Sequence, residues 1–226
     1  MESKIIKAVL FDLDGTITDT EKYYHLYWPK AFAKFGYTIT DKQALGMRSL
    51  GSPYVEEYVE KLFGKDVNLN AIKECARILV DESVAANGLE LKDGVVECLK
   101  FLKTKNVKIA IVTATAAERT KKYLKEANIE EYFDDIISAK NVPRGKPAPD
   151  VYLTACERLG IKPENTIAVE DSPNGVKSAS GARCNVVMVP DQTEADEEIK
   201  RYLFGCLKTL GEFEKFVGEK RVIFDK

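Results

Sequence analysis

Short apolar runs rich in β-branched residues alternate with segments of helical periodicity along most of the chain. Buried parallel strands have this pattern, because helices cover both of their faces. The runs predict strands at residues 5–11, 107–112, 133–137, 166–169 and 185–189. Helices are predicted between them at residues 95–103, 116–127, 149–159 and 175–179. This alternation predicts an α/β fold with a doubly wound, Rossmann-like parallel sheet and right-handed crossovers.

The stretch from residue 21 to residue 88 has a different pattern. Apolar and aromatic residues recur there at helical spacing, and glycine-containing breaks separate the helical segments. Helices are predicted at residues 21–35, 54–63 and 71–86, with no strand among them. We therefore expect a helical cap domain at residues 21–88, inserted into an α/β core domain of residues 1–20 and 89–226. Residues 221–226 are too few to assign.

Composition narrows the class of protein. The 226 residues are 45% hydrophobic, which supports a packed core, and 34 basic residues nearly balance 36 acidic ones. This balance gives no reason to expect nucleic acid or a membrane surface as a partner. The five cysteines are dispersed and lack CxxC spacing, so we expect neither a disulfide framework nor a zinc site. With no signal peptide or membrane span recognisable, we expect a cytoplasmic monomer.

The first apolar run ends in two aspartates, Asp12 and Asp14, followed by Gly15. Side chains at positions i and i+2 of a strand point to the same side, so the two carboxylates can converge. Open α/β sheets bind their ligands at the carboxyl ends of the strands, where these aspartates lie. Two carboxylates this close repel each other, and a divalent cation is the usual compensation. The sequence therefore predicts a ligand and cation site here.

Two later segments carry groups that could bind an anion. Thr113 ends the second predicted strand, and its hydroxyl could hold an anion together with backbone N–H groups, although Thr113 or Thr115 could equally cap the next helix. Lys146 lies in the segment GKPAPD, where two prolines stiffen the loop and open a helix. It could neutralise phosphate oxygens and the aspartate pair. The alternative is an exposed surface lysine.

A further strand ends in two acids, Glu170 and Asp171. This repeats the logic of the first motif, since Mg²⁺ prefers carboxylate and water oxygens. The alternative is a solvated turn in which Asp171 or Ser172 caps the following helix. A doubly wound sheet brings all of these strand ends to one edge, and this favours a shared site.

The segments FDLDGTITDT and GKPAPD, with Thr113 and the acidic pair in this order, resemble the haloacid dehalogenase superfamily over about residues 9–171. The resemblance is to the helical-cap phosphatases and the β-phosphoglucomutase-like subgroup. It implies that Asp12 is the nucleophile and Asp14 the general acid and base. The implied phosphate-binding residues are Thr113, Ala114 and Lys146. The implied ligands of Mg²⁺ are Asp12, the Asp14 backbone carbonyl and Asp171, with Glu170 beside them through water.

The resemblance implies a Mg²⁺-dependent phosphatase that hydrolyses a small phosphorylated metabolite, such as a sugar phosphate, through an aspartyl phosphate. The alternative is a mutase of the β-phosphoglucomutase type. The cap histidine of the mutases corresponds to Tyr24 here, and His25 is one residue away, a rotation of about 100° on a helix. Leu45 stands where the mutases have a lysine, Arg48 is displaced by one residue, and Ala117 lies near the position of a second missing lysine. These departures favour the phosphatase.

Two other classes are weighed against this prediction. A dehalogenase needs no second acid such as Asp14 and no metal, so Asp14 counts against it. A non-catalytic binding module that retained the fold would have lost a motif residue, and none is missing here.

Overall fold

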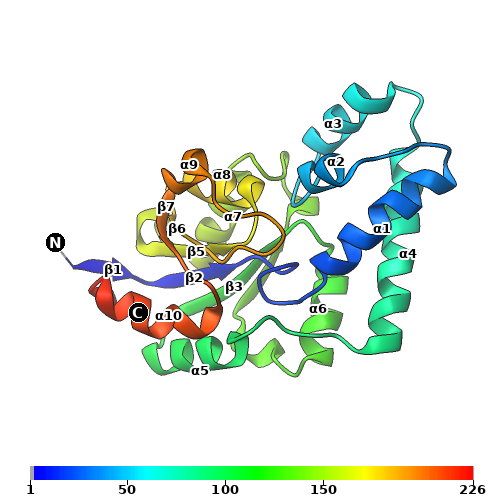
Figure 1. The fold of residues 1–226 in the computed structure, drawn as a ribbon. Coiled ribbons are helices and arrows are strands. Elements are labelled where there is room, and N and C mark those ends of the chain that lie inside the picture. The colour runs from blue at the N-terminus through cyan, green and yellow to red at the C-terminus, as the bar shows by residue number, and fades with distance from the viewer. Residues whose placement is uncertain (1–2, 226) are drawn as a thin grey trace.

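In the computed structural model, which describes residues 3–225, six parallel strands form the central sheet in the order β4-β3-β2-β5-β6-β7 (Figure 1). Its strands are β2 (Ala8–Phe11), β3 (Lys108–Thr113), β4 (Asp135–Ser138), β5 (Thr166–Glu170), β6 (Asn185–Met188) and β7 (Leu203–Cys206). The order reverses direction at β2, which lies between β3 and β5. This is the topological switch point where doubly wound sheets place their ligands.

Helices cover both faces of the sheet because successive side chains of each strand point to opposite faces and both faces are apolar (Figure 1). Val9 and Phe11 of β2 face the layer of α5 (Val95–Lys105), α6 (Ala117–Glu126) and α10 (Phe213–Glu219). Leu10 of the same strand faces the layer of α7 (Asp150–Leu159), α8 (Pro173–Gly181) and α9 (Glu197–Lys200). The predicted doubly wound α/β fold is therefore confirmed.

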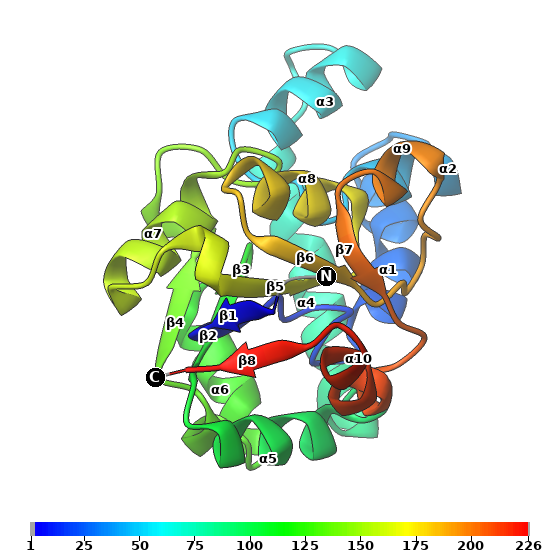
Figure 2. The same ribbon diagram turned by 90° about the vertical axis from the view of Figure 1, so that its left-hand side faces the viewer.

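The predicted strand at residues 5–11 is in fact two strands. β1 (Lys4–Ile6) leaves the central sheet and pairs in parallel with β8 (Val222–Phe224), as Figure 2 shows. At the break, the Lys7 N–H donates to Asn165 and the Lys7 carbonyl accepts from Lys108. The backbone therefore stays hydrogen-bonded while the chain passes from one sheet to the other.

The C-terminal part of the chain was largely unpredicted. It contains α9, β7, α10 and β8. Of residues 221–226, β8 accounts for three, and Lys226 lies outside the described residues. β7 is a partly exposed edge strand and β8 has three residues, so neither shows a long apolar run. The short 3₁₀ turns were also not predicted: η1 (Glu130–Tyr132), η2 (Ala139–Asn141), η3 (Pro163–Asn165) and η4 (Leu210–Glu212).

A helical layer stands beside the carboxyl edge of the sheet (Figure 1). It consists of α1 (Glu21–Lys34), α2 (Asp41–Gly46), α3 (Tyr54–Phe63) and α4 (Leu69–Asn87), which share an apolar cluster of their own. The short α2 was not predicted, and its start is fixed by a reciprocal capping box between Thr40 and Gln43. The boundaries of the cap domain at residues 21 and 88 stay a prediction. Among residues 3–225, none of the helices is both long and apolar enough to cross a membrane.

The helical layer touches the α/β core through paired backbones. The Gly51 N–H donates to the Lys146 carbonyl over 2.8 Å, and the Gly145 N–H donates to the Ser52 carbonyl over 2.8 Å. Gly51 and Gly145 meet so closely that a Cβ on Gly51 would lie 2.6 Å from the Gly145 Cα. The loop between α2 and α3 is thus joined to the loop that carries the candidate phosphate-binding lysine.

Substituting Gly94 by alanine should destabilise the protein by about 3 kcal/mol or more. Gly94 has φ +80°, and an added Cβ would lie 2.0 Å from the Gly211 nitrogen, so the C-terminal segment would have to move. The matched control is Gly36→Ala, with φ +83° and nothing within 4 Å of the added Cβ. It should cost about 1 kcal/mol, from backbone strain alone. Urea denaturation measures both, and equal losses would contradict the packing argument.

Candidate active site

The sheet topology brings the predicted strand-end residues together. β2 leads into Asp12 and Asp14, β3 ends at Thr113, and β5 ends at Glu170. Because β2 is hydrogen-bonded to both β3 and β5, these ends are neighbours at one edge. A cavity of about 380 Å³ opens over them between the sheet edge and the helical layer.

The candidate residues divide into two groups by their position relative to the cavity. Its floor is formed in part by Asp12, Asp14, Thr113 and Ala114. The remaining candidates, Lys146, Glu170 and Asp171, do not line the cavity but lie fully buried next to Asp12.

Lys146 is a buried cation between two carboxylates. Its side chain is 0% exposed, and its Nζ lies 2.6 Å from Asp12 Oδ1 and 2.6 Å from Glu170 Oε1. It also donates to the Val112 carbonyl over 3.1 Å. Burial opposes the charge, but Asp12 and Glu170 outweigh it and raise the pKa of Lys146. The alternative of an exposed surface lysine is therefore wrong.

Asp12, Glu170 and Asp171 form a buried acidic group, with candidate ligand oxygens all within 4.8 Å of one another. Burial raises the pKa of Glu170 to about 8 and the pKa of Asp171 to about 7, although Lys146 and Arg48 respectively counteract it. Glu170 Oε2 and Asp171 Oδ1 have no hydrogen-bond partner within the described part of the chain. Unpaired, closely spaced carboxylate oxygens are the donor set that fits a hard divalent cation.

Two glycines make room for this acidic group. A Cβ on Gly175 would lie 1.9 Å from Glu170 Oε2, and one on Gly15 would lie 2.3 Å from Asp171 Oδ2. Gly15 also has φ +85°, which disfavours other residues. The glycine that follows the aspartate pair is therefore required by the acids of the neighbouring strand as well as by the turn.

The carboxylate of Asp14 lies outside the acidic group and is held by two hydroxyls. Thr20 donates to it over 2.6 Å and Thr115 over 2.7 Å. The Thr113 hydroxyl accepts from the Thr115 N–H over 3.0 Å, which fixes that loop. The N-cap residue of α6 is Ala116, so neither Thr113 nor Thr115 caps this helix, and the capping alternative is wrong for this segment. Thr115 was not predicted as a site residue.

The second capping alternative is correct only in part. Ser172 accepts from the Gly175 N–H over 3.2 Å and caps α8. Glu170 and Asp171, however, are buried rather than part of a solvated turn.

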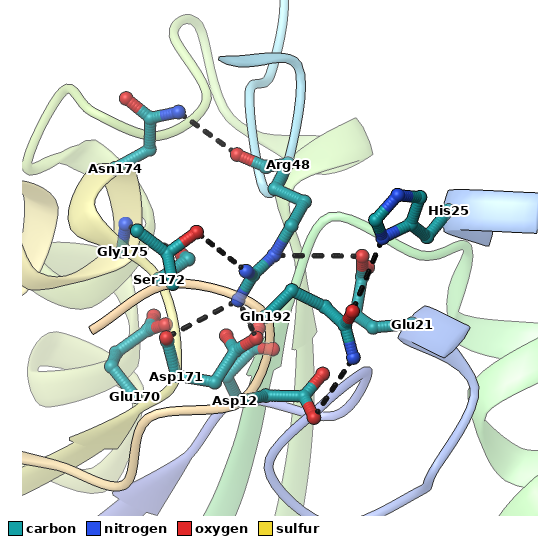
Figure 3. Close-up of polar contacts among 12 residues, drawn as sticks. Asp12, Glu21, His25, Arg48, Glu170, Asp171, Ser172, Asn174, Gly175 and Gln192 are labelled. Carbon is teal, nitrogen blue, oxygen red and sulfur yellow. Dashed lines mark hydrogen bonds and ion pairs between the residues drawn. The ribbon is translucent and has the colours of Figure 1, made fainter. Parts of the chain in front are cut away.

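Arg48, noted in the sequence only as displaced from the mutase position, is the main residue whose place in the site was not predicted (Figure 3). It follows α2 in the helical layer, yet its buried guanidinium forms an ion pair with Asp171 and donates to Thr193 over 3.0 Å. Its Nε lies 3.6 Å from Glu21, and its carbonyl accepts from Asn174 over 2.9 Å. No local pattern could have indicated these contacts, because the partners on the core are distant in sequence.

The wall of the cavity opposite the sheet combines aromatic and apolar side chains with basic ones. Tyr24, Trp28 and Met47 represent the first kind, and Lys73 and Arg77 the second. His25, one residue from the position of the mutase histidine, was expected to point in another direction on the helix. Tyr24 does line the cavity, and His25 does not. His25 instead lies 3.2 Å from Gln192, as Figure 3 shows, and 3.8 Å from Asp41.

Comparison with known proteins agrees with this arrangement. Residues 9–189 match the model of the haloacid dehalogenase-like hydrolases, and the chain belongs to this family. The family prediction is therefore confirmed, and with it the prediction of a hydrolase.

Two phosphatases are similar to this chain over most of their length. A phosphorylated carbohydrates phosphatase of Thermotoga maritima is 33% identical over 180 residues, covering 78% of this chain and 82% of that protein. A validoxylamine A 7'-phosphate phosphatase of Streptomyces hygroscopicus subsp. limoneus is 30% identical, covering 91% and 95%. A crystal structure of β-phosphoglucomutase from Clostridium difficile superimposes with a TM-score of 0.80 at 23% identity, covering 96% and 97%. This last likeness shows the fold.

Replacing Lys146 by methionine should destabilise the protein by about 3–5 kcal/mol, because Asp12 and Glu170 would lose their buried counter-ion. The control is Lys140→Met, an exposed lysine at the rim of the cavity, which should change stability by less than about 0.5 kcal/mol. Urea denaturation in the presence of a chelator measures both. A loss below about 1 kcal/mol for Lys146→Met would show that the lysine does not compensate the acids.

Proposed function

We propose that the protein is a Mg²⁺-dependent phosphatase that hydrolyses a small phosphorylated metabolite, such as a sugar phosphate, through an aspartyl phosphate on Asp12. The observation that carries the proposal is the position of Asp12. It faces the cavity, lies 2.6 Å from the buried Lys146, and has the second acid, Asp14, beside it on the same cavity. The names of the relatives, which include phosphatases of phosphorylated carbohydrates, also support it.

In this proposal the chain's own residues perform two steps. Asp12 attacks phosphorus in line and displaces the leaving oxygen, to which a protonated Asp14 gives its proton. Asp14 then takes a proton from water, which attacks the acyl phosphate and restores the Asp12 carboxylate. Lys146 offsets the charge of Asp12, while the Thr113 hydroxyl and the Ala114 N–H bind the phosphate oxygens.

The acidic group is the proposed Mg²⁺ site. Asp12, the Asp14 backbone carbonyl and Asp171 would hold the cation, with Glu170 beside them. The bound cation would supply positive charge that screens the repulsion between the Asp12 carboxylate and an anionic ester. A cavity of about 380 Å³ suits a small metabolite, and the helical layer above it would exclude bulk water. A cytoplasmic monomer without nucleic-acid or membrane partners completes the proposal.

The hydrolase is favoured over the mutase by the lining of the cavity. Tyr24 occupies the position of the mutase histidine and accepts a hydrogen bond from Arg119 over 2.7 Å. Burial above all, and the charge of Asp14 in addition, raise the pKa of the Tyr24 phenol. Near neutral pH the phenol therefore cannot relay a proton, whereas an imidazole can. Leu45, at the position of the mutase lysine, carries no charge and does not line the cavity.

Asp12→Asn should abolish turnover by a factor of about 10³ or more while the protein stays folded, because an amide oxygen cannot replace the attacking carboxylate. The control is Asp19→Asn in the same segment. Asp19 pairs with Lys22 and Lys92 and does not line the cavity, so activity should stay within about threefold of the wild type. Phosphate release by the purified, folded variants measures both. Activity above about 1% in Asp12→Asn would refute the nucleophile assignment.

Removal of divalent cations with a chelator should reduce phosphate release by at least about a hundredfold, and added Mg²⁺ should restore it. Ca²⁺ in excess over Mg²⁺ should inhibit, because it takes more ligands at longer distances and would spoil the in-line arrangement. Undiminished hydrolysis in the chelator would exclude a required cation on Asp171.

Inorganic phosphate should be the main product from β-glucose 1-phosphate, supplied with Mg²⁺ and a trace of β-glucose 1,6-bisphosphate. The chain lacks the histidine and the lysine that would engage Asp14 only when a sugar is bound, so water should reach the phosphoenzyme before the sugar intermediate can turn around. Phosphorus NMR distinguishes the products. Glucose 6-phosphate that accumulates much faster than inorganic phosphate would establish the mutase instead.

A further inference from the structure

Tyr24 brings a phenol to the cavity from the helical layer. It lies on α1, lines the same cavity as Asp12 and Asp14, and stacks on Trp28 with ring centroids 6.2 Å apart and an interplanar angle of 29°. The phosphoryl group in the proposed function is bound at the sheet edge. A phenol on the facing wall is therefore positioned for the organic part of the ester.

The Tyr24 hydroxyl is held from the core. Arg119 on α6 donates to it over 2.7 Å. Arg119 is itself fixed by an ion pair with Asp81 over 2.8 Å and by a hydrogen bond to the Tyr123 hydroxyl over 2.6 Å. This network joins α6 to both α1 and α4, so the phenol has a defined position rather than a free rotamer.

Within residues 3–225, the proton of this hydroxyl has no acceptor. A phenol can donate one hydrogen bond and accept others, and in this part of the chain the Tyr24 hydroxyl only accepts one from Arg119. Burial raises the pKa of the phenol, and Asp14 adds to this, so the proton is retained at neutral pH. A donor that is oriented, partly buried and unpaired beside an empty space is suited to a ligand oxygen.

We propose that Tyr24 donates a hydrogen bond to a hydroxyl or ether oxygen on the organic part of the substrate, and that it thereby makes the enzyme prefer phosphate esters of polyols, such as sugars, over esters of plain alcohols. This inference rests on the proposed phosphatase function and adds a specificity residue to it. Leaving the donor unpaired against a plain alkyl chain loses this contact, whereas a sugar oxygen completes it.

The test compares two esters, ribose 5-phosphate and butyl phosphate, in the wild type and in Tyr24→Phe. Phenylalanine keeps the ring on Trp28 and removes only the hydroxyl. The kcat/KM for ribose 5-phosphate should fall about five- to tenfold, the range of one neutral hydrogen bond, while that for butyl phosphate should change less than about twofold.

The matched control is Tyr27→Phe. Tyr27 lies on the same helix, but its hydroxyl is hydrogen-bonded to Ser83 over 2.6 Å and it does not line the cavity, so the ratio of the two kcat/KM values should stay at its wild-type value. Arg119→Lys, which should no longer orient the phenol, is expected to reproduce the selective loss. If circular dichroism shows that Tyr24→Phe does not fold, the selective loss in Arg119→Lys tests the role of Tyr24 instead.

The outcomes separate this inference from the function on which it rests. Equal losses for both esters in Tyr24→Phe, no loss for ribose 5-phosphate, or a matching change of the ratio in Tyr27→Phe would overturn the role of Tyr24 while the hydrolase stands. A folded wild type that releases no phosphate from either ester, or from any phosphorylated metabolite, would overturn the proposed function and this inference with it.

Discussion

The Lys146 ammonium between Asp12 and Glu170 is the interaction on which the rest of the site depends. Three carboxylates are gathered at the end of the central strands, where water cannot screen their repulsion. A buried cation on a proline-stiffened loop allows Asp12 and Glu170 to stay close together without solvent. The third acid, Asp171, has its own counter-ion in Arg48, which comes from the helical layer. Charge compensation in this structure is therefore divided between the core and the layer above it.

This division explains why the helical layer is more than a cover. Arg48 and the backbone contacts of Gly51 and Ser52 tie it to the strand ends, while Tyr24 is tied to α6 through Arg119. Any movement of the layer away from the sheet would break contacts to an acid and to the lysine loop at once. The geometry of the floor and that of the wall are thus coupled through specific side chains.

How well each element could be predicted from the sequence depended on how deeply it is buried and how long it is. The central strands and the helices between them were predictable because full burial requires continuous apolar runs. The clustering of Asp12, Thr113 and the acidic pair followed from parallel topology, whereas Lys146 reaches them from the loop before α7. Short or edge elements such as β7 and β8 lacked that signal. The break at Lys7 was not predictable, because it depends on a partner strand at the far end of the chain. Arg48, Thr115 and Arg119 were missed for the same reason, since tertiary contact alone identifies them.

The contact between Gly51 and Gly145 has a consequence for how such a chain can diverge. The two backbones approach so closely that neither position accepts a side chain, although one belongs to the helical layer and the other to the core. Residues facing the cavity can be exchanged to suit a new substrate, because they border empty space. This pair cannot vary in the same way, since a change in either residue separates the two loops. Substitutions in the helical layer are therefore tolerated more readily on the cavity wall, where they change the preference for a substrate, than at this contact with the lysine loop.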